Sequence, residues 1–336
     1  MAARIGASVM PRPSLGTAAK LLTGVALLAV LVWQVDIAKV GALLRRTDPL
    51  LFIGATCAAG IGLAAQALRW SIVARELTPV LSLRDALIGV YEGQFVNQIM
   101  PAMIGGDAVR ALRAYDAGAT AGRAILGVLL DRAFGLLFIA LIVIATFALS
   151  AAPVVAAPVF QFITIAAGLV VAGALALAIV GPLVATLSLP HWLAALASVI
   201  AGFATIARRP IAMLQLAAAM LVAAAGLAAG IALSARAIGV TLSPVDAIVV
   251  LTGIVIAGAI PLSVGGWGLR EGATVLLLKA AGVEAAAAVS LAILFGLALT
   301  VLGIAGGAVW LTSGYRRVDR ATGLGELKRA ATGAPP

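Results

Sequence analysis

Residues 101–110 read Pro-Ala-Met-Ile-Gly-Gly-Asp-Ala-Val-Arg, and residues 261–270 read Pro-Leu-Ser-Val-Gly-Gly-Trp-Gly-Leu-Arg. A proline, two adjacent glycines and an arginine therefore recur at a constant offset of 160 residues (261 minus 101). The match continues upstream, where the Leu-Ser and Asp-Ala pairs of residues 81–86 return in residues 242–247 at an offset of 161 (242 minus 81). Duplicated units with a Gly/Pro-broken apolar segment at corresponding positions are typical of transporter-like membrane proteins, in which the breaks mark the binding site.

The composition of the 336-residue chain agrees with a membrane protein. Hydrophobic residues make up 63% and charged residues 11%, and the mean hydropathy is +1.17, whereas a globular domain has about half apolar and about a quarter charged residues. The 23 basic residues outnumber the 13 acidic ones, which gives a net charge of +10. Because the basic residues stand between apolar runs, they indicate membrane orientation by the positive-inside rule and no nucleic-acid partner.

The sequence lacks the residues of the common catalytic and metal sites. Cys57 is the only cysteine and His191 the only histidine, which excludes an intrachain disulfide and argues against a thiol metal cluster and a histidine-nucleophile phosphatase. It contains no Gly-x-Ser-x-Gly elbow, no Walker loop and no aspartate cluster with metal-binding spacing. We therefore expect a protein that is not an enzyme and that needs no cofactor or metal.

Apolar runs of about 17–25 residues can cross a bilayer as helices, and such runs occur at about 19–35, 50–70, 124–150, 158–187, 211–234 and 287–311. Two further regions, about 85–120 and about 245–283, contain the Pro-x-x-x-Gly-Gly motif and predict broken or re-entrant helical hairpins. Lipid cannot satisfy free backbone groups, so the breaks must face the protein interior. The expected fold is an all-α polytopic membrane protein with about six full transmembrane helices and two broken hairpins.

The two units are expected to form an inverted repeat, because three full spans separate the hairpins and the second copy enters from the opposite face. The predicted organisation is a cytoplasmic N-terminal segment (1–18), a first repeat (19–150), a second repeat (151–311) and a basic cytoplasmic tail (312–336). Both termini are then cytoplasmic, as are most basic residues, including Arg69 and Arg113. The exceptions, which fall on the outer side, are Lys39, Arg45, Arg46 and Arg236.

Each break combines a proline, a glycine pair at the start of a helix, and an arginine. These residues are Pro101, Gly105, Gly106 and Arg110 in the first copy and Pro261, Gly265, Gly266 and Arg270 in the second. The exposed N–H groups and the dipole of such a helix start favour an anion such as a phosphate. Asp107 and Glu271 are candidate partners of the two arginines. Alternatively, Asp107 only caps its half-helix and both arginines extend to the membrane interface.

Polar residues around the breaks predict a cavity. The candidate lining residues are Glu92, Gln94, Asn97 and Gln98 before the first break and Trp267 in the second. The second copy has Thr252, Ile254, Ala257 and Gly258 at the positions that match the first four. A cavity that is polar on one side and apolar on the other suits a molecule with a polar head and hydrocarbon tails. Alternatively, these polar groups only bond to backbone freed by the break.

One more pair of charges, Asp131 and Arg132, lies about two helical turns into the third span. Their charges are candidate partners of Arg110 or Asp107. An ion pair kept for folding alone explains them equally well, because buried charges also pair to avoid being left alone.

The order Asn97…Pro101…Gly105-Gly106-Asp107…Arg110, then Asp131-Arg132, then Pro261…Gly265-Gly266-x-Gly268-x-Arg270-Glu271, resembles the lysylphosphatidylglycerol synthase transmembrane-region family. Its members are also called flippase-like membrane proteins. The resemblance covers the chain from the first span to about Leu311. It implies an integral protein of the bacterial inner membrane that moves or handles phospholipids or related amphiphiles between leaflets. The soluble aminoacyltransferase domain of the synthases is absent, so only the membrane half of their function is implied.

We therefore expect a lipid translocator in which half-helix N-termini, Arg110 and Arg270 hold an anionic headgroup while the tails stay in the bilayer. Rocking of one repeat against the other would open the cavity to alternate leaflets. Two alternatives remain open: a non-transporting scaffold that presents lipid to a partner synthase or glycosyltransferase, and a transporter of small soluble anions. The sequence also leaves open the lipid cargo and whether the chain forms homo-oligomers.

Overall fold

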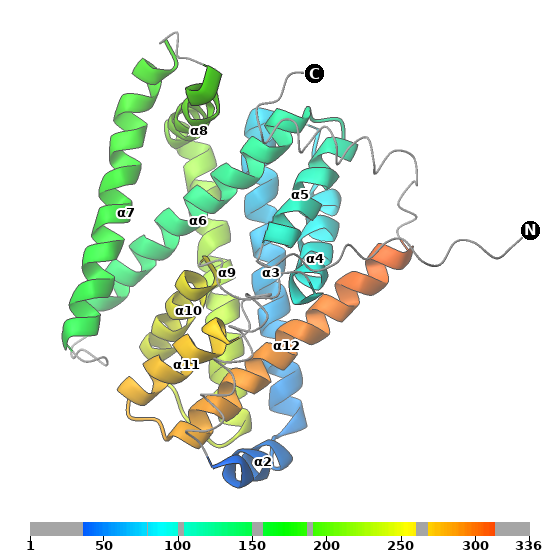
Figure 1. The fold of residues 1–336 in the computed structure, drawn as a ribbon, viewed down its shortest axis with the longest axis vertical. Coiled ribbons are helices and arrows are strands. Elements are labelled where there is room, and N and C mark those ends of the chain that lie inside the picture. The colour runs from blue at the N-terminus through cyan, green and yellow to red at the C-terminus, as the bar shows by residue number, and fades with distance from the viewer. Residues whose placement is uncertain are drawn as a thin grey trace, which may run out of the picture.

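The computed structural model describes residues 36–78, 80–99, 104–149, 157–186, 191–259 and 268–312, and all regular elements among them are helices (Figure 1). In chain order they are α2 (Ile37–Arg45), α3 (Pro49–Leu77), α4 (Leu83–Ile99), α5 (Ile104–Asp116), α6 (Ala121–Leu149), α7 (Ala157–Val184), α8 (His191–Ala207), α9 (Pro210–Ala237), α10 (Pro244–Ala259), α11 (Leu269–Ala280) and α12 (Ala285–Thr312). Within these ranges, 5 helices are long and apolar enough to cross a membrane, namely α3, α6, α7, α9 and α12. The prediction of an all-α polytopic membrane protein is confirmed, and the expected first span at 19–35 lies outside the described residues.

Helix α3 is longer than its apolar run predicts, and this changes the position of its last polar residues. It begins at Pro49, where the Asp48 carboxylate accepts hydrogen bonds from the N–H groups of Leu50 (2.8 Å) and Leu51 (3.1 Å), and it continues to Leu77. A proline at the first position and an aspartate before it are the preferred start of a helix. Arg69 therefore lies two turns inside the helix and not at its flank.

Both predicted hairpins are pairs of packed helices. Helices α4 and α5 flank residues 100–103 and contact each other, and α10 and α11 do the same around residues 260–267. The two pairs lie towards opposite ends of the long axis of the molecule (Figure 1), which is the arrangement that an inverted repeat requires. The centres of the breaks, including Pro101, Pro261, Gly265, Gly266 and Trp267, lie outside the described residues.

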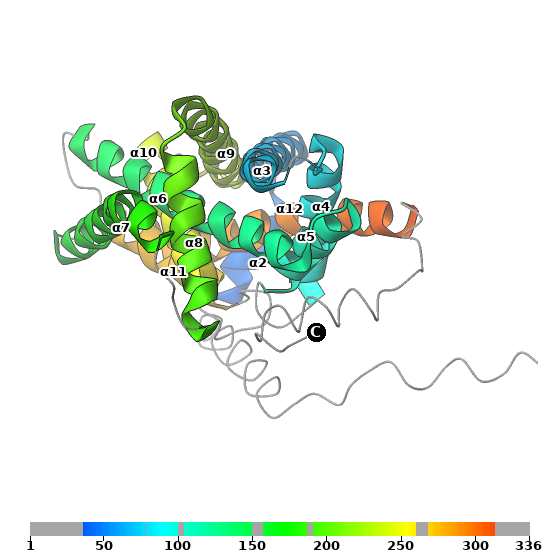
Figure 2. The same ribbon diagram turned by 90° about the horizontal axis from the view of Figure 1, so that it is seen from above.

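Two helices of the first unit, α3 and α4, have counterparts in the second at a nearly constant offset. Helix α9 begins 161 residues after α3 (210 minus 49) and ends 160 residues after it (237 minus 77), and α10 follows α4 at the same offsets. Figure 2 shows the equivalent helices α3 and α9 side by side. They approach closely at Gly62 and Gly226, since a Cβ atom added to Gly226 would lie 2.7 Å from the Gly62 nitrogen. The two units thus meet through matching helices at a crossing that only glycine permits.

Replacement of Gly226 by leucine should separate α3 from α9, because the new side chain has no space at the crossing. Overpacking of this kind costs about 1–3 kcal/mol or more, so the apparent Tm of the purified protein in detergent should fall. Gly168→Leu on α7 is the matched control, because open space surrounds Gly168. Equal Tm values for the two variants would contradict the role of the crossing.

Candidate functional site

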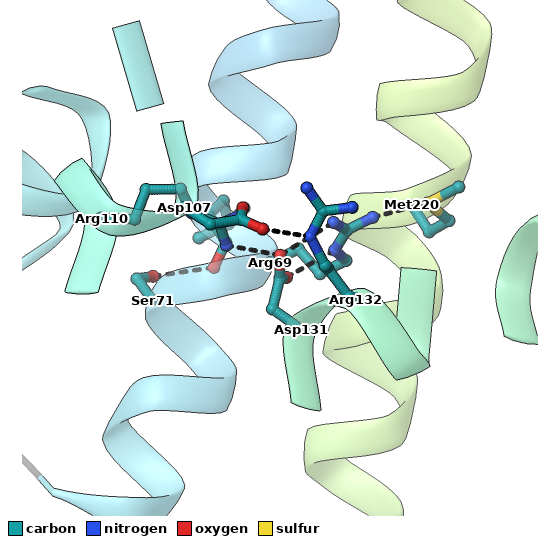
Figure 3. A network of polar contacts seen from close by, with 8 residues as sticks. Arg69, Ser71, Asp107, Arg110, Asp131, Arg132 and Met220 are labelled. Carbon is teal, nitrogen blue, oxygen red and sulfur yellow. Dashed lines mark hydrogen bonds and ion pairs between the residues drawn. The ribbon is translucent and has the colours of Figure 1, made fainter. Parts of the chain in front are cut away.

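Five charged side chains from α3, α5 and α6 form an alternating series that we call the charge ladder: Arg69, Asp131, Arg110, Asp107 and Arg132 (Figure 3). Asp131 accepts from Arg69 Nε at 2.7 Å and Nη2 at 3.0 Å, and its Oδ2 also accepts from Arg110 Nη2 at 2.5 Å. Asp107 accepts from Arg110 Nη1 at 3.4 Å and from Arg132 Nε. Three arginines against two aspartates leave the ladder with one excess positive charge.

Burial decreases along the ladder from Asp131 to Arg132. The Asp131 side chain is 1% exposed and that of Arg69 is 10% exposed, whereas that of Arg132 is 41% exposed. The inner end is enclosed by the protein: Arg69 Nη1 donates to the Met220 sulfur at 3.2 Å, and a Cβ atom on Gly135 would lie 3.0 Å from the same nitrogen. The inner charges therefore act as a fixed support, and Arg132 is the member that reaches the surface.

The ladder contains pairings that the sequence suggested and one residue that it did not. Arg110 pairs with Asp131, and Arg132 pairs with Asp107, as anticipated for the charges on the third span. Arg69 was assigned to the cytoplasmic flank, but it is buried in α3 and holds Asp131 with two nitrogens. The missed signal was the apolar sequence Ile72-Val73-Ala74 that follows Arg69, which shows that the helix continues beyond it.

A cavity of about 300 Å³ lies beside the ladder, between the two units. Its polar and charged lining residues all belong to α3–α6: Gln66, Arg69, Gln94, Asn97, Asp107, Arg110, Asp131 and Arg132. The opposite wall comes from α9, α10 and α12 and carries only apolar side chains: Met220, Ala223, Ala224, Leu227, Leu251, Ile254, Val255, Phe295 and Leu299. The cavity is therefore polar on the side of the first unit and apolar on the side of the second.

The polar wall has hydrogen-bond donors that are not used within the protein, beside acceptors such as the side-chain oxygen of Gln94, whose amide nitrogen donates to the Leu299 carbonyl. The Asn97 side-chain oxygen accepts from the Gly106 N–H at 2.8 Å, which orients its amide nitrogen away from that bond. Arg110 Nε is buried without a partner in the described part of the chain, and Arg132 uses only Nε in its pair with Asp107. Unused donors and an excess positive charge favour an anionic ligand, because bonds from arginine to phosphate or carboxylate oxygens are the strong ones.

Gly106 positions the start of α5 against α4. A Cβ atom at this position would lie 2.5 Å from Asn97 Nδ2, and one on Gly93 would lie 3.0 Å from the Gly106 carbonyl oxygen. The neighbouring Gly105 is buried and is not a lining residue of the cavity. Gly106 is thus needed for the close approach that lets Asn97 bond to the backbone at the break.

Besides Gly105, four predicted residues of the described ranges lie away from the cavity. Glu92 is fully buried and accepts from Arg113 Nε (2.8 Å) and Nη2 (2.5 Å), so it joins α4 to α5 instead of lining the cavity. Gln98 points towards Gly303 of α12. Arg270 and Glu271 pair with each other on α11, at 2.6 Å between Nη2 and Oε1. Among the described residues, Arg110 lines the cavity and Arg270 does not.

Glu271 has a structural role at the start of α11. Its Oε2 accepts from the Gly268 N–H at 2.7 Å, which closes the first turn of the helix. A Cβ atom on Gly296 of α12 would lie 3.0 Å from Arg270 Nη2, so the pair packs directly on α12. The second copy of the motif thus has an internal ion pair where the first copy contributes to the charge ladder.

Replacement of Asp131 by asparagine should destabilise the protein strongly, because Arg69 and Arg110 would lose the carboxylate that they share. Breaking a buried pair by removing one partner costs about 3–5 kcal/mol. Asp107→Asn is the matched control, since the Asp107 side chain is 22% exposed and water can solvate its partners. Thermal unfolding of both variants in the same detergent measures the difference, and similar Tm losses would show that Asp131 is not the support of the ladder.

The comparison with known proteins agrees with this architecture. No curated protein matches the chain. The sequence profile described as "Lysylphosphatidylglycerol synthase TM region" matches residues 17–307, which include α2 to α11 and most of α12. The chain is an integral membrane protein that belongs to the lysylphosphatidylglycerol synthase transmembrane-region family.

Proposed function

We propose that this protein is a lipid translocator that takes an anionic phospholipid headgroup, or that of a related amphiphile, into the cavity between its two units. The observation that carries the proposal is the division of the cavity into a charged wall with one excess positive charge and a wholly apolar wall. A lipid is divided in the same way, into a polar headgroup and apolar acyl chains. The proposed partners are lipids of the bacterial inner membrane, and the proposal includes no catalytic step.

The exposed residues of α6 support entry of a lipid headgroup into the cavity from the bilayer. Arg132 is the twelfth residue of this helix, about 17 Å along its axis from Ala121, and its side chain is 41% exposed. Leu129 and Leu136, one turn away on either side, are 46% and 43% exposed. An arginine within a membrane span costs about 2.5–3.5 kcal/mol on insertion scales. A lipid phosphate that enters beside Leu136 would bond to the terminal nitrogens of Arg132, which its pair with Asp107 through Nε does not use.

The size of the cavity agrees with a headgroup and not with a whole lipid. Its volume of about 300 Å³ lies at the lower end of the range for small-molecule sites, about 300–1,000 Å³. Acyl chains would therefore remain outside, against the apolar surface of α6, while the phosphate contacts Arg132 and then Arg110. Since both arginines are already held by aspartates, the site is preorganised for the headgroup.

The headgroup would reach the other leaflet through a movement of the two repeated units relative to each other. In transporters built from inverted repeats, one unit rocks against the other around a central site. Here the units meet at the Gly62–Gly226 crossing of α3 and α9, and the cavity lies between them. We propose this crossing as the pivot, because close helix contact without side chains permits small rotations.

A dithionite assay tests the function. Liposomes that contain the purified protein and a fluorescent anionic phospholipid should lose more fluorescence than protein-free liposomes, because lipid that crosses to the outer leaflet is quenched. Arg132→Gln should slow this loss about tenfold or more, since a hydrogen bond to a charged group contributes about 1.5–3 kcal/mol. Arg208→Gln is the control, because Arg208 is exposed and distant from the cavity lining. Loss equal to that of empty liposomes, or equal rates for both variants, would refute the proposal.

A further inference from the structure

Helix α2 lies across one end of the helix bundle (Figure 1). Val40, Leu43 and Leu44 form its inner face and pack on the hydrophobic core, and α2 contacts α12. Its remaining surface is exposed, including Ala42 and Arg45. The helix thus has one face on the protein and another directed outward at the end of the bundle.

Three arginines gather at this end. Arg45 and Arg46 are exposed at the C-terminal end of α2. Arg236 is exposed near the end of α9, which lies against the turn between α2 and α3, because the N–H of Asp48 in this turn donates to the Ala237 carbonyl at 2.9 Å. Arg45 Nε bonds only to the Gly41 carbonyl of its own helix, and the three guanidinium groups have no carboxylate partner within the described ranges.

The acidic residues at this end bond to groups other than the three arginines, although Asp246 Oδ1 has no partner within the described ranges. Asp36 and Asp48 accept from backbone N–H groups at the starts of α2 and α3. Glu284 pairs with Lys39 at 3.4 Å, and Asp246 accepts from the backbone and hydroxyl of Ser243. The positive charge of the three arginines is therefore not neutralised by a direct ion pair.

Large apolar side chains are exposed beside these charges. Ile37 at the start of α2 is 66% exposed, and Leu50 and Ile53 in the first turns of α3 are 76% and 58% exposed. A short helix that combines exposed apolar residues with arginines is suited to the membrane–water interface, where its apolar groups meet acyl chains and its cations meet acidic headgroups. The combination of positive charge and exposed apolar groups indicates that this surface binds lipids.

We infer that Arg45, Arg46 and Arg236 form an interfacial binding site for the headgroups of anionic lipids, with Ile37, Leu50 and Ile53 against their acyl chains. The site is separate from the cavity, none of whose lining residues lies in α2, and it binds lipid whether or not the protein translocates it. It also accounts for basic residues on the side where the positive-inside rule expects few.

Brominated lipids test this site. The full-length protein carries a bimane group on A42C in a C57S background, since Cys57 is the only cysteine, and is reconstituted in phosphatidylcholine vesicles. Quenching by brominated phosphatidylglycerol should exceed quenching by brominated phosphatidylcholine. The ratio of the binding constants for phosphatidylglycerol and phosphatidylcholine measures the preference for the anionic lipid. Each arginine should raise this ratio about fivefold, so R45Q/R46Q/R236Q should bring it close to one. R84Q/R208Q should leave it unchanged, because Arg84 at the start of α4 and Arg208 in the turn between α8 and α9 are exposed and lie outside α2.

Salt gives a second measurement that needs no arginine variant. The Debye length shortens from about 10 Å at 0.1 M to about 3 Å at 1 M salt, so the preference of the otherwise unaltered labelled protein for phosphatidylglycerol should fall as salt rises. Equal quenching by the two lipids, a preference that survives R45Q/R46Q/R236Q, or a preference independent of salt would each overturn the inference. Lipid scrambling is measured separately and tests only the proposed translocation.

Discussion

The Asp131 carboxylate holds two guanidinium groups at once, Arg69 of α3 and Arg110 of α5, inside a membrane-spanning helix where none of the three charges would be stable alone. The remainder of the polar wall depends on this bond. It joins α3, α5 and α6, it fixes Arg110 at the edge of the cavity, and it leaves Asp107 and Arg132 to form the outer end of the ladder. The ladder as a whole carries one excess positive charge, and Arg132, with a side chain that is 41% exposed, is the member that reaches the surface.

The duplication supplies two equivalent frameworks, and only the first brings charged side chains to the cavity. Phe295 is as far into α12 as Asp131 is into α6 (295 minus 285, and 131 minus 121), and both residues line the cavity. Without a carboxylate at that position, Arg270 pairs with its neighbour Glu271 and packs on α12. The same fold therefore provides a charged wall from one unit and an apolar wall from the other. This difference between equivalent positions is what makes the cavity suitable for an amphiphile.

The sequence was sufficient for the helical membrane class, both helix–break–helix pairs and four members of the charge ladder, because each depends on a local signal: an apolar run, a repeated motif or a charge within a span. The sequence did not predict the buried position of Arg69, because a charge near the end of an apolar run resembles an interfacial anchor until the end of the helix is known. Nor did it reveal that Glu92 pairs with Arg113 across the hairpin, or that Arg270 faces α12. Those contacts depend on how helices pack, which periodicity and spacing do not encode.

A cryo-EM map of the protein in nanodiscs that contain anionic phospholipid tests the central claim most directly. The account predicts density for a lipid phosphate within hydrogen-bonding distance of Arg132 or Arg110, with the amide of Asn97 nearby and the acyl chains leaving the cavity past Leu136. A map of equal quality that shows ordered lipids around the protein, but only water or side chains between the charge ladder and Phe295, would contradict it.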